Sequence, residues 1–196
     1  MSEDRRGAQL ASSGREPSKR IIGEAPMAVL DILHYPDERL RQEAQPVPEV
    51  DDELRRLIDD MVETMYSARG IGLAAPQVDR HQRLLVMDTS EDQSEPLALV
   101  NPEIVAASGE QEGDEGCLSL PGVFEPVVRA AQITARFTDR EGNPREEVFT
   151  DLAARCVQHE LDHLEGKLFV DYLSKLKRNR LRKKMEKDKR LQADPA

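Results

Sequence analysis

Residues 158–163 read Gln-His-Glu-Leu-Asp-His, which gives His159, Glu160 and His163 the spacing of an HExxH motif. Residues four apart in a helix lie on the same face, so both imidazoles can bind one metal ion. Glu160 follows the first histidine and points beside the ion, where a bound water would lie. The motif therefore predicts a metal-dependent hydrolytic site, with Glu160 as a base rather than a ligand.

A catalytic divalent metal site usually takes three protein ligands, so a third ligand must be sought elsewhere. Position 169, where an extended motif has another histidine, is Phe169, and a glutamate about twenty residues downstream would fall in the basic segment KKMEKDK. Upstream, Cys117 lies in a predicted loop in which Gly113 and Gly116 permit close backbone approach. A thiolate bound to a divalent cation needs no other activation, so Cys117 is the candidate ligand; the alternative is a small buried residue. The other cysteine, Cys156, is expected to pack behind the metal-binding helix.

The segment Gly-Ile-Gly-Leu-Ala-Ala-Pro-Gln-Val, residues 70–78, carries little side-chain bulk. Its glycines and alanines would let an extended peptide approach the backbone and pair with it as a strand does. Gln77 would then supply a neutral amide donor. The same segment is also typical of an ordinary turn after a helix, so both interpretations stay open on these residues alone.

Two helices and several strands have to position these residues. Apolar residues recur at helical spacing from Val50 to Gly70, and residues 151–164 before Gly166 predict a second helix capped by Asp151. Segments rich in Val, Ile and Leu at 83–88, 97–105 and 124–138 predict antiparallel strands, and a hairpin turn at 139–143 leads into another at 146–149. This order of elements predicts an α+β fold.

The composition suits one folded domain. The chain has 196 residues, of which 38% are apolar and 34% charged, enough for a real core. Residues 1–26 show no apolar periodicity, and we expect a disordered N-terminal extension. No run of residues resembles a membrane span or a secretory signal, so we expect a soluble protein that stays where it is made. Two cysteines cannot form a disulfide framework, which favours a reducing compartment.

The C-terminal segment is strongly basic. Residues 174–190 contain ten basic and two acidic residues, a net charge of +8, whereas the whole chain carries −10, so the remainder carries −18. Such segregated charge could dock on nucleic acid or another polyanion. The alternative is a solvated helix whose Leu173, Leu176 and Leu181 pack back on the body. The sequence alone leaves both open.

The three chemical segments together resemble the peptide deformylase family, whose motifs have the form GφGφAAxQ, EGCφS and HEφDH, φ being apolar. All three are present in this order, and the resemblance extends over about residues 27–190. It implies antiparallel β-sheets packed around a central metal-binding HExxH helix, with a basic C-terminal helix. We expect a catalytic domain over 27–173 and a basic helix and tail over 174–196. The implied reaction is removal of the N-formyl group from the initiator methionine of new proteins, which releases formate.

The resemblance also implies roles for individual residues. By the family's pattern, Cys117, His159 and His163 bind the metal, Glu160 is the acid/base, and Gln77 with the Leu118 amide forms the oxyanion site. The substrate backbone is expected to pair at Ile71 and Gly72, within substrate-binding segments that include Gly70, Glu115 and Gly116. Fe²⁺ is the expected metal, with Zn²⁺, Ni²⁺ or Co²⁺ as alternatives.

The implied partners are N-formylmethionyl nascent peptides, with ribosome contact through the basic C-terminal helix. We expect a monomer in the bacterial cytoplasm that binds neither DNA nor membranes. Two competing functions are an HExxH endopeptidase, which would need a downstream third ligand, and a ribosome-associated binding module with a structural zinc site. A closed structural site would need a fourth protein ligand, and no further cysteine near Cys117 offers one.

Overall fold

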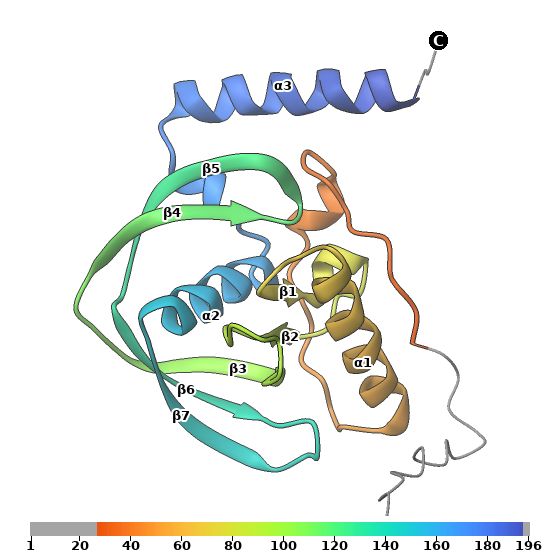
Figure 1. Cartoon of the computed structure of the whole chain (residues 1–196), viewed down its shortest axis with the longest axis vertical. Helices are drawn as coiled ribbons and strands as arrows, with labels where there is room; N and C mark the ends of the chain where they lie inside the picture. The colour runs from red at the N-terminus through yellow and green to blue at the C-terminus, as the bar shows by residue number, and fades with distance from the viewer. Residues whose placement is uncertain (1–26, 194–196) are drawn as a thin grey trace, which may run out of the picture.

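The computed structural model describes residues 27–193; the predicted N-terminal extension, residues 1–26, lies outside this range. Within this range the chain forms two β-sheets, three α-helices and three short 3₁₀ helices (Figure 1). The α-helices are α1 (Asp52–Ser67), α2 (Asp151–Leu164) and α3 (Lys175–Ala193); the strands are β1 (Gly72–Ala74), β2 (Leu84–Met87), β3 (Leu97–Ser108), β4 (Gln111–Cys117), β5 (Leu120–Arg129), β6 (Gln132–Thr138) and β7 (Pro144–Thr150). The 3₁₀ helices are η1 (Glu38–Arg41), η2 (Ala75–Val78) and η3 (Phe169–Tyr172). The predicted α+β class with antiparallel sheets is confirmed.

Helix α2 lies between the two sheets. One sheet has five strands in the order β1-β2-β3-β6-β7, and the other is the β4–β5 hairpin. Figure 1 shows α2 running between this hairpin and the five-stranded sheet, with α1 to one side. The helix that carries the HExxH motif is therefore covered on both sides, which fits ten buried residues among its fourteen.

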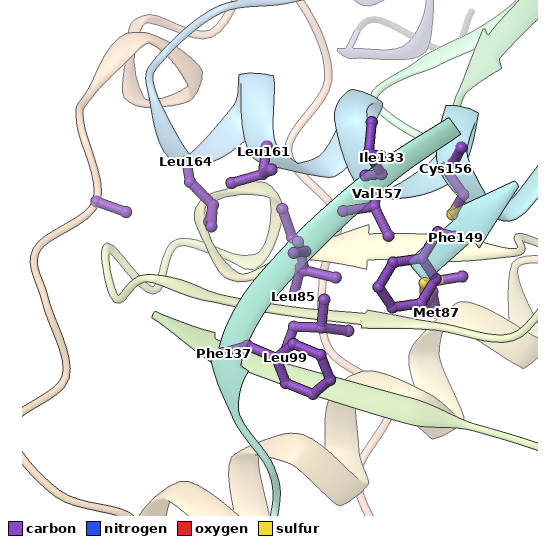
Figure 2. Packing of buried hydrophobic residues seen from close by; sticks show 14 residues of the cluster. Leu85, Met87, Leu99, Ile133, Phe137, Phe149, Cys156, Val157, Leu161 and Leu164 are labelled. Atoms are coloured by element: carbon purple, nitrogen blue, oxygen red, sulfur yellow. The ribbon is translucent and has the colours of Figure 1, made fainter. Parts of the chain in front are cut away.

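The central strands are apolar on both faces because each face is covered by a helix. Leu85, Met87 and Leu99 point toward α2, where they meet Val157 and Leu161 (Figure 2). Their alternate neighbours in β2 and β3, together with Leu73 of β1, pack against α1 instead. Successive side chains of a strand point to opposite faces, and here both faces are covered by a helix. All four residues of β2 are therefore apolar and buried.

Helix α1 agrees with its prediction. Asp51 is the N-cap, and its side chain accepts a hydrogen bond from the main-chain nitrogen of Leu54. The start of α2 differs from its prediction, because Thr150 rather than Asp151 is the N-cap and its side chain makes no capping bond. Asp151 is instead the first helical residue, with φ of 49°, and its main-chain nitrogen bonds to the carbonyl of Ala131.

Two strand predictions need correction. The segment 124–138 is not one strand: its first half pairs with β4 and its second half with β3 and β7. Gln158 of α2 fixes the crossing point by bonding both the nitrogen and the carbonyl of Ala130. The segment around Cys117, predicted as a loop, is strand β4. Its sequence, QEGDEGC, has low strand propensity, so pairing with β5 rather than local preference makes it a strand.

The basic C-terminal segment forms α3, which packs against the hairpin side of the molecule (Figure 1). Met185 is buried in the cluster that includes Val123 and Val127 of β5, and Leu173 and Leu181 pack partly against it. Leu176, expected to pack inward, is exposed. Within residues 27–193, no helix is long and apolar enough to cross a membrane.

Candidate metal centre

Cys117, His159 and His163 come together although 42 residues separate the cysteine from the first histidine. Their ligand atoms all lie within 4.8 Å of one another, and Cys117 Sγ is 3.3 Å from His163 Nε2. The histidines lie one turn apart on α2, and the cysteine ends β4 above that helix. The structure thus brings together the three ligands predicted from the sequence.

His159 is oriented by a carboxylate. Its Nδ1 lies 2.9 Å from Oε2 of the buried Glu115, and its ring stacks on Phe169 at a centroid distance of 6.1 Å. Because Nδ1 is used in this way, Nε2 is left for a metal ion, the arrangement that carboxylate–histidine–metal sites share. Burial lowers the pKa of His159, but hydrogen bonds to Cys117 and Glu115 outweigh it and raise the pKa well above its usual value.

Glu115 is the centre of a buried ionic network. Its two oxygens accept bonds from Arg129 Nε and Nη2 at 2.8 and 2.9 Å, and Oε1 also accepts one from Arg155 Nη1 at 3.0 Å. Arg129 continues to Asp162, at 2.7 Å, whose carboxylate accepts bonds from the Tyr172 hydroxyl. Burial alone would raise the pKa of Glu115, but Arg129 and His159 lower it to about 2. The carboxylate is therefore fully ionised and bonded on all sides.

The sequence reasoning assigned Glu115 only to substrate binding and did not identify its arginine partners. Arg129 and Arg155 are charged residues in a chain that is one-third charged, and no local pattern marks them as buried. A buried arginine needs a partner, and its partner here comes from another strand or helix. The ionic network around Glu115 becomes visible only in the tertiary structure, where β4, β5 and α2 pack together.

Glu160 lines the same pocket as Cys117 and His159. It is 4% exposed, and its Oε2 has no hydrogen-bond partner within residues 27–193. Burial raises the pKa of its carboxyl to about 7, against an opposing effect of His159. A Cβ at Gly72 would collide with Glu160 Oε1 and lie 2.7 Å from Cys156 Sγ, so the glycine leaves room for the carboxylate.

These observations fit a bound transition-metal ion. One thiolate and two imidazoles form a donor set that suits zinc, iron, cobalt or nickel rather than calcium or magnesium. Three protein ligands leave a position for water, and the unpaired Glu160 oxygen is a buried acceptor that such a water would satisfy. The described residues offer no fourth Cys, His, Asp or Glu within this group, so the site is open rather than closed.

Gln77 aims its amide at the centre. Its Oε1 accepts a bond from the Ala74 nitrogen at 2.8 Å, which turns Nε2 toward Ser119 Oγ at 3.1 Å and Cys117 Sγ at 3.5 Å. The buried side chain is thereby fixed in one orientation. Leu118, the next residue after Cys117, lies in the hairpin turn, and its side chain packs over Gly70, where a Cβ would lie 2.7 Å from Leu118 Cδ1.

Strand β1 is a free sheet edge. The Ile71 carbonyl accepts a bond from the Asp88 nitrogen in β2's extension and one from Cys156 Sγ, so it points inward. Backbone groups alternate along an antiparallel strand, so those of Gly72 point outward, away from β2.

Cys156 packs between α2 and β1, beside Glu160, and not behind the helix as expected. It lies four residues before Glu160 and shares the same helix face.

The predicted substrate segments line one pocket of about 590 Å³. Gly70, Ile71 and Gly72 form one side, Glu115 and Gly116 belong to the hairpin side, and His159 and Glu160 of α2 lie at the base; Gln77, Cys117 and Leu118 also line it. The 70% exposed Phe124 stands at the hairpin side, against Gly116, where a Cβ would lie 2.5 Å from its ring. An extended peptide could therefore pair with β1 and place its end at the metal centre.

Comparison with known proteins agrees with this geometry. The family model described as polypeptide deformylase matches residues 29–179. A peptide deformylase of Nitrosococcus oceani is 61% identical over 167 residues, which cover 85% of this chain and all of the relative. One from Pseudomonas aeruginosa is 58% identical over 168 residues, covering 85% of this chain and all of the relative.

Solved structures give the same result. The crystal structure of a peptide deformylase from Legionella pneumophila matches with a TM-score of 0.81 and 53% identity, covering 86% of this chain and all of that one. The enzyme of Ehrlichia chaffeensis in complex with actinonin matches with a TM-score of 0.81 and 42% identity, covering 84% and 99% of the two chains. Family model, relatives and structures thus agree over the part of the chain that builds the metal centre, and this chain belongs to the polypeptide deformylase family.

Proposed function

We propose that Cys117, His159, His163 and Glu160 carry out in this chain the reaction of its family. That reaction is the metal-dependent hydrolysis of the N-formyl group from N-terminal formylmethionine of nascent peptides. The observation that carries these assignments is a cluster of one thiol and two imidazoles, with a buried, unpaired carboxylate lining the same pocket as Cys117 and His159 next to the edge strand β1. This arrangement supports neither the endopeptidase nor the structural zinc module considered above.

A divalent metal ion held by Cys117, His159 and His163 would supply a Lewis acid and a water of lowered pKa. Glu160, within the same pocket, accepts the proton of the attacking water and then gives it to the leaving amine. The tetrahedral oxyanion needs donors, which Gln77 Nε2 and the Leu118 main-chain N–H provide. Loss of one such donor typically costs about 10² to 10³ in rate.

The peptide is held by backbone pairing. The outward N–H and C=O of Gly72 are free to bond an extended substrate, as in β-strand addition. Gly70 and Gly116 have no side chain to obstruct it, and the packed positions of Leu118 and Phe124 next to them fix the width of the pocket. The main chain of the substrate is thereby aligned so that its formyl end reaches Glu160.

We propose Fe²⁺ as the ion used in the cell, with Zn²⁺, Ni²⁺ and Co²⁺ as alternatives. The support is the mixed thiolate and imidazole donor set, which each of these ions accepts. We expect anaerobically purified, iron-loaded protein to release formate from a formyl-Met-Ala-Ser peptide. A cysteine thiolate beside ferrous iron is open to oxidation, so exposure to air should remove this activity while nickel-loaded protein keeps it. Equal activity of the aerobic and anaerobic iron preparations would argue against iron.

Replacement of Cys117 by serine should weaken metal retention. A serine hydroxyl is a poorer ligand for these ions than a thiolate, and the two histidines remain in place. The measurement is metal content per chain after gel filtration against a chelator. Cys156→Ser is the matched control, since this second cysteine is buried nearby but is not one of the three ligands. Equal metal loss from both variants would contradict the assignment of Cys117.

We propose that α3 docks on the ribosome. Within α3, Leu181 packs partly on the body while Arg180 and Lys184 are exposed and belong to a segment of net charge +8. A basic surface of this kind binds the polyanionic phosphate backbone in a salt-dependent way.

Charge reversal tests this docking better than truncation, because removal of α3 would expose the cluster under Met185. The double variant Arg180→Glu, Lys184→Glu should lose co-sedimentation with ribosomes and keep formate release. The control is Arg56→Glu, Arg80→Glu, which reverses two exposed charges of the body. Equal loss in both double variants, or in neither, would reject docking through α3.

We further propose that the protein works as a monomer in the bacterial cytoplasm and that residues 27–173 form its catalytic domain. The support is that the similar relatives described above are bacterial peptide deformylases, together with a pocket built from one chain. The mass obtained by sedimentation velocity tests the oligomeric state directly.

A further inference from the structure

Strand β1 is the edge that the proposed function uses, yet little packing holds its start. The strand has only three residues, Gly72–Ala74, and it is the outermost strand of its sheet. Ile71, the residue before it, is 42% exposed and so contributes little buried surface. Its carbonyl accepts a bond from the main-chain nitrogen of Asp88 at 2.9 Å and one from Cys156 Sγ at 3.4 Å. The position of the edge therefore depends on polar contacts at Ile71.

The turn that leads into this strand is strained. Arg69 has a φ of 57°, in the left-handed region that arginine rarely adopts. Its main-chain nitrogen donates to the Tyr66 carbonyl at 2.9 Å, and that of Gly70 donates to the Met65 carbonyl at 2.9 Å. These bonds close the end of α1 just before the edge. A backbone in this conformation persists only where the surrounding structure holds it.

Asp88 holds this edge from the other side. It directly follows β2 and is 3% exposed, and its carboxylate accepts a bond at 2.5 Å from the hydroxyl of Tyr66, in the last turn of α1. The same carboxylate accepts bonds from the nitrogen and the hydroxyl of Ser90, at 2.8 and 2.6 Å, and from the nitrogen of Glu95 at 3.1 Å. Asp88 thereby connects the end of α1 to the end of β2, and its own N–H is the donor to Ile71.

This arrangement is costly for a contact that only stabilises the fold, because burial of a charge without an opposite charge is unfavourable. No lysine, arginine or histidine among residues 27–193 pairs with Asp88, so neutral donors alone hold the carboxylate. Burial by itself raises the pKa of Asp88, but hydrogen bonds from Ser90, Tyr66 and Glu95 lower it below its usual value. An ionised carboxylate accepts more bonds than an amide or a hydroxyl, which suits a group that fixes several segments at once.

We infer that Tyr66 and Asp88 are positioning residues for the substrate edge. Their hydrogen bond fixes the place of the Asp88 nitrogen, which holds the Ile71 carbonyl inward and leaves the N–H and C=O of Gly72 directed outward for pairing. Neither residue lines the pocket, so both act through the edge rather than by contact with the substrate. The inference rests on the proposed function, because it concerns the main chain that follows the formylated methionine.

The test compares a long and a short substrate on the same nickel-loaded protein. Formyl-Met-Ala-Ser can pair along the edge, whereas formyl-methionine amide keeps the formyl group and the first side chain but lacks the two residues that follow. The wild-type protein should have a higher kcat/KM for the long substrate. Tyr66→Phe removes only the hydroxyl, and it should lower the long-to-short ratio of kcat/KM by about 3- to 30-fold, a range typical of residues that act on a site without contacting its ligand. The change should lie in KM for the long substrate, with kcat nearly unchanged.

Asp88→Asn tests the other partner of the bond. The amide keeps the shape of the side chain but offers one acceptor oxygen in place of two, so the long-to-short ratio should fall here as well. If the two residues act as one unit, the double variant Tyr66→Phe, Asp88→Asn should lower the ratio no further than the larger of the single effects.

Tyr172→Phe is the matched control. It removes a hydroxyl that another tyrosine donates to a buried aspartate, Asp162, and neither of these two residues lines the substrate pocket. Any loss of metal or stability in this variant lowers the rates for both substrates together, so its long-to-short ratio should equal that of wild type. A merely structural role of Tyr66 predicts the same unchanged ratio for Tyr66→Phe.

An unchanged ratio in Tyr66→Phe, or an equal fall in Tyr172→Phe, would overturn the inference and leave the proposed function intact. A wild type that gains nothing from the two added residues would overturn the inference together with the backbone pairing, but not the deformylation itself. If Asp88→Asn cannot be purified, Tyr66→Phe alone decides, since it keeps the ring that packs on the cluster under α1. Absence of formate from both substrates with metal-loaded wild type would overturn the proposed function and this inference with it.

Discussion

Glu160→Ala should retain its metal and lose turnover by a factor of about 10² to 10⁴, the usual contribution of a positioned general acid/base. Glu160 lines the same pocket as Cys117 and His159 but is not one of the three candidate ligands, so its removal leaves Cys117, His159 and His163 intact. The measurement combines metal content per chain with kcat for formate release from formyl-Met-Ala-Ser.

The same substitution should not destabilise the metal-free protein. Glu160 Oε2 is buried without a hydrogen-bond partner in the described part of the chain, and burial of such an atom costs free energy. Its removal should therefore leave the Tm of the metal-free protein unchanged or raise it, a trade between activity and stability common at active sites. Glu165→Ala, at the exposed end of α2, is the control. Full activity of metal-loaded Glu160→Ala would contradict the assignment of Glu160 as the general acid/base.

Glu115→Gln should produce the largest loss of stability of any single change in the pocket. The amide keeps the shape of the side chain but leaves Arg155 without its carboxylate partner and Arg129 with Asp162 alone. Removal of one partner of a buried ion pair costs about 3 to 5 kcal/mol. Since a single amide oxygen has to replace the two carboxylate oxygens that serve both arginines and His159, the orientation of the His159 ring is weakened, and metal affinity should fall by about 10- to 100-fold. Urea denaturation and competition with a chelator measure the two effects.

The hairpin offers a matched control. Glu125 is the cross-strand partner of Glu115, but its ion pair is with the exposed Lys177 of α3 rather than with a buried arginine. Glu125→Gln removes the same charge from a partly exposed pair, for which a loss of about 1 kcal/mol or less is expected. If both variants lose the same stability, the network around Glu115 does not have the strength that its burial implies.

Much of the centre could be predicted from the sequence because its spacing is local. His159 and His163 are four residues apart in an amphipathic segment, and this spacing alone places them on one face of a helix. The two helices and the α+β class followed from periodicity in the same way, although the predicted N-cap of α2 was wrong. Cys117 was found by exclusion of downstream ligands, and the resemblance of three motifs to one family supplied the rest of the predicted site.

Other features depended on contacts between distant segments. Strand β4 has a sequence poor in strand-forming residues and exists because β5 pairs with it. Cys156 was expected behind the metal helix and lies in front of it, against Ile71, because the face it shares with Glu160 is the face that β1 covers. No pattern within ten residues of either segment contains this information.

The sequence by itself determined the chemistry: which residues can bind a metal, which one can move a proton, and which helix carries them. Only the tertiary structure decided how these groups are held. Glu115, Arg129 and Arg155 come from β4, β5 and α2, and these three buried charged residues are partners across the three elements. Residue spacing reports which side chains share one helix face or one strand face. The free energy of a buried charge depends on its neighbours in space, which are fixed only when the three elements pack together.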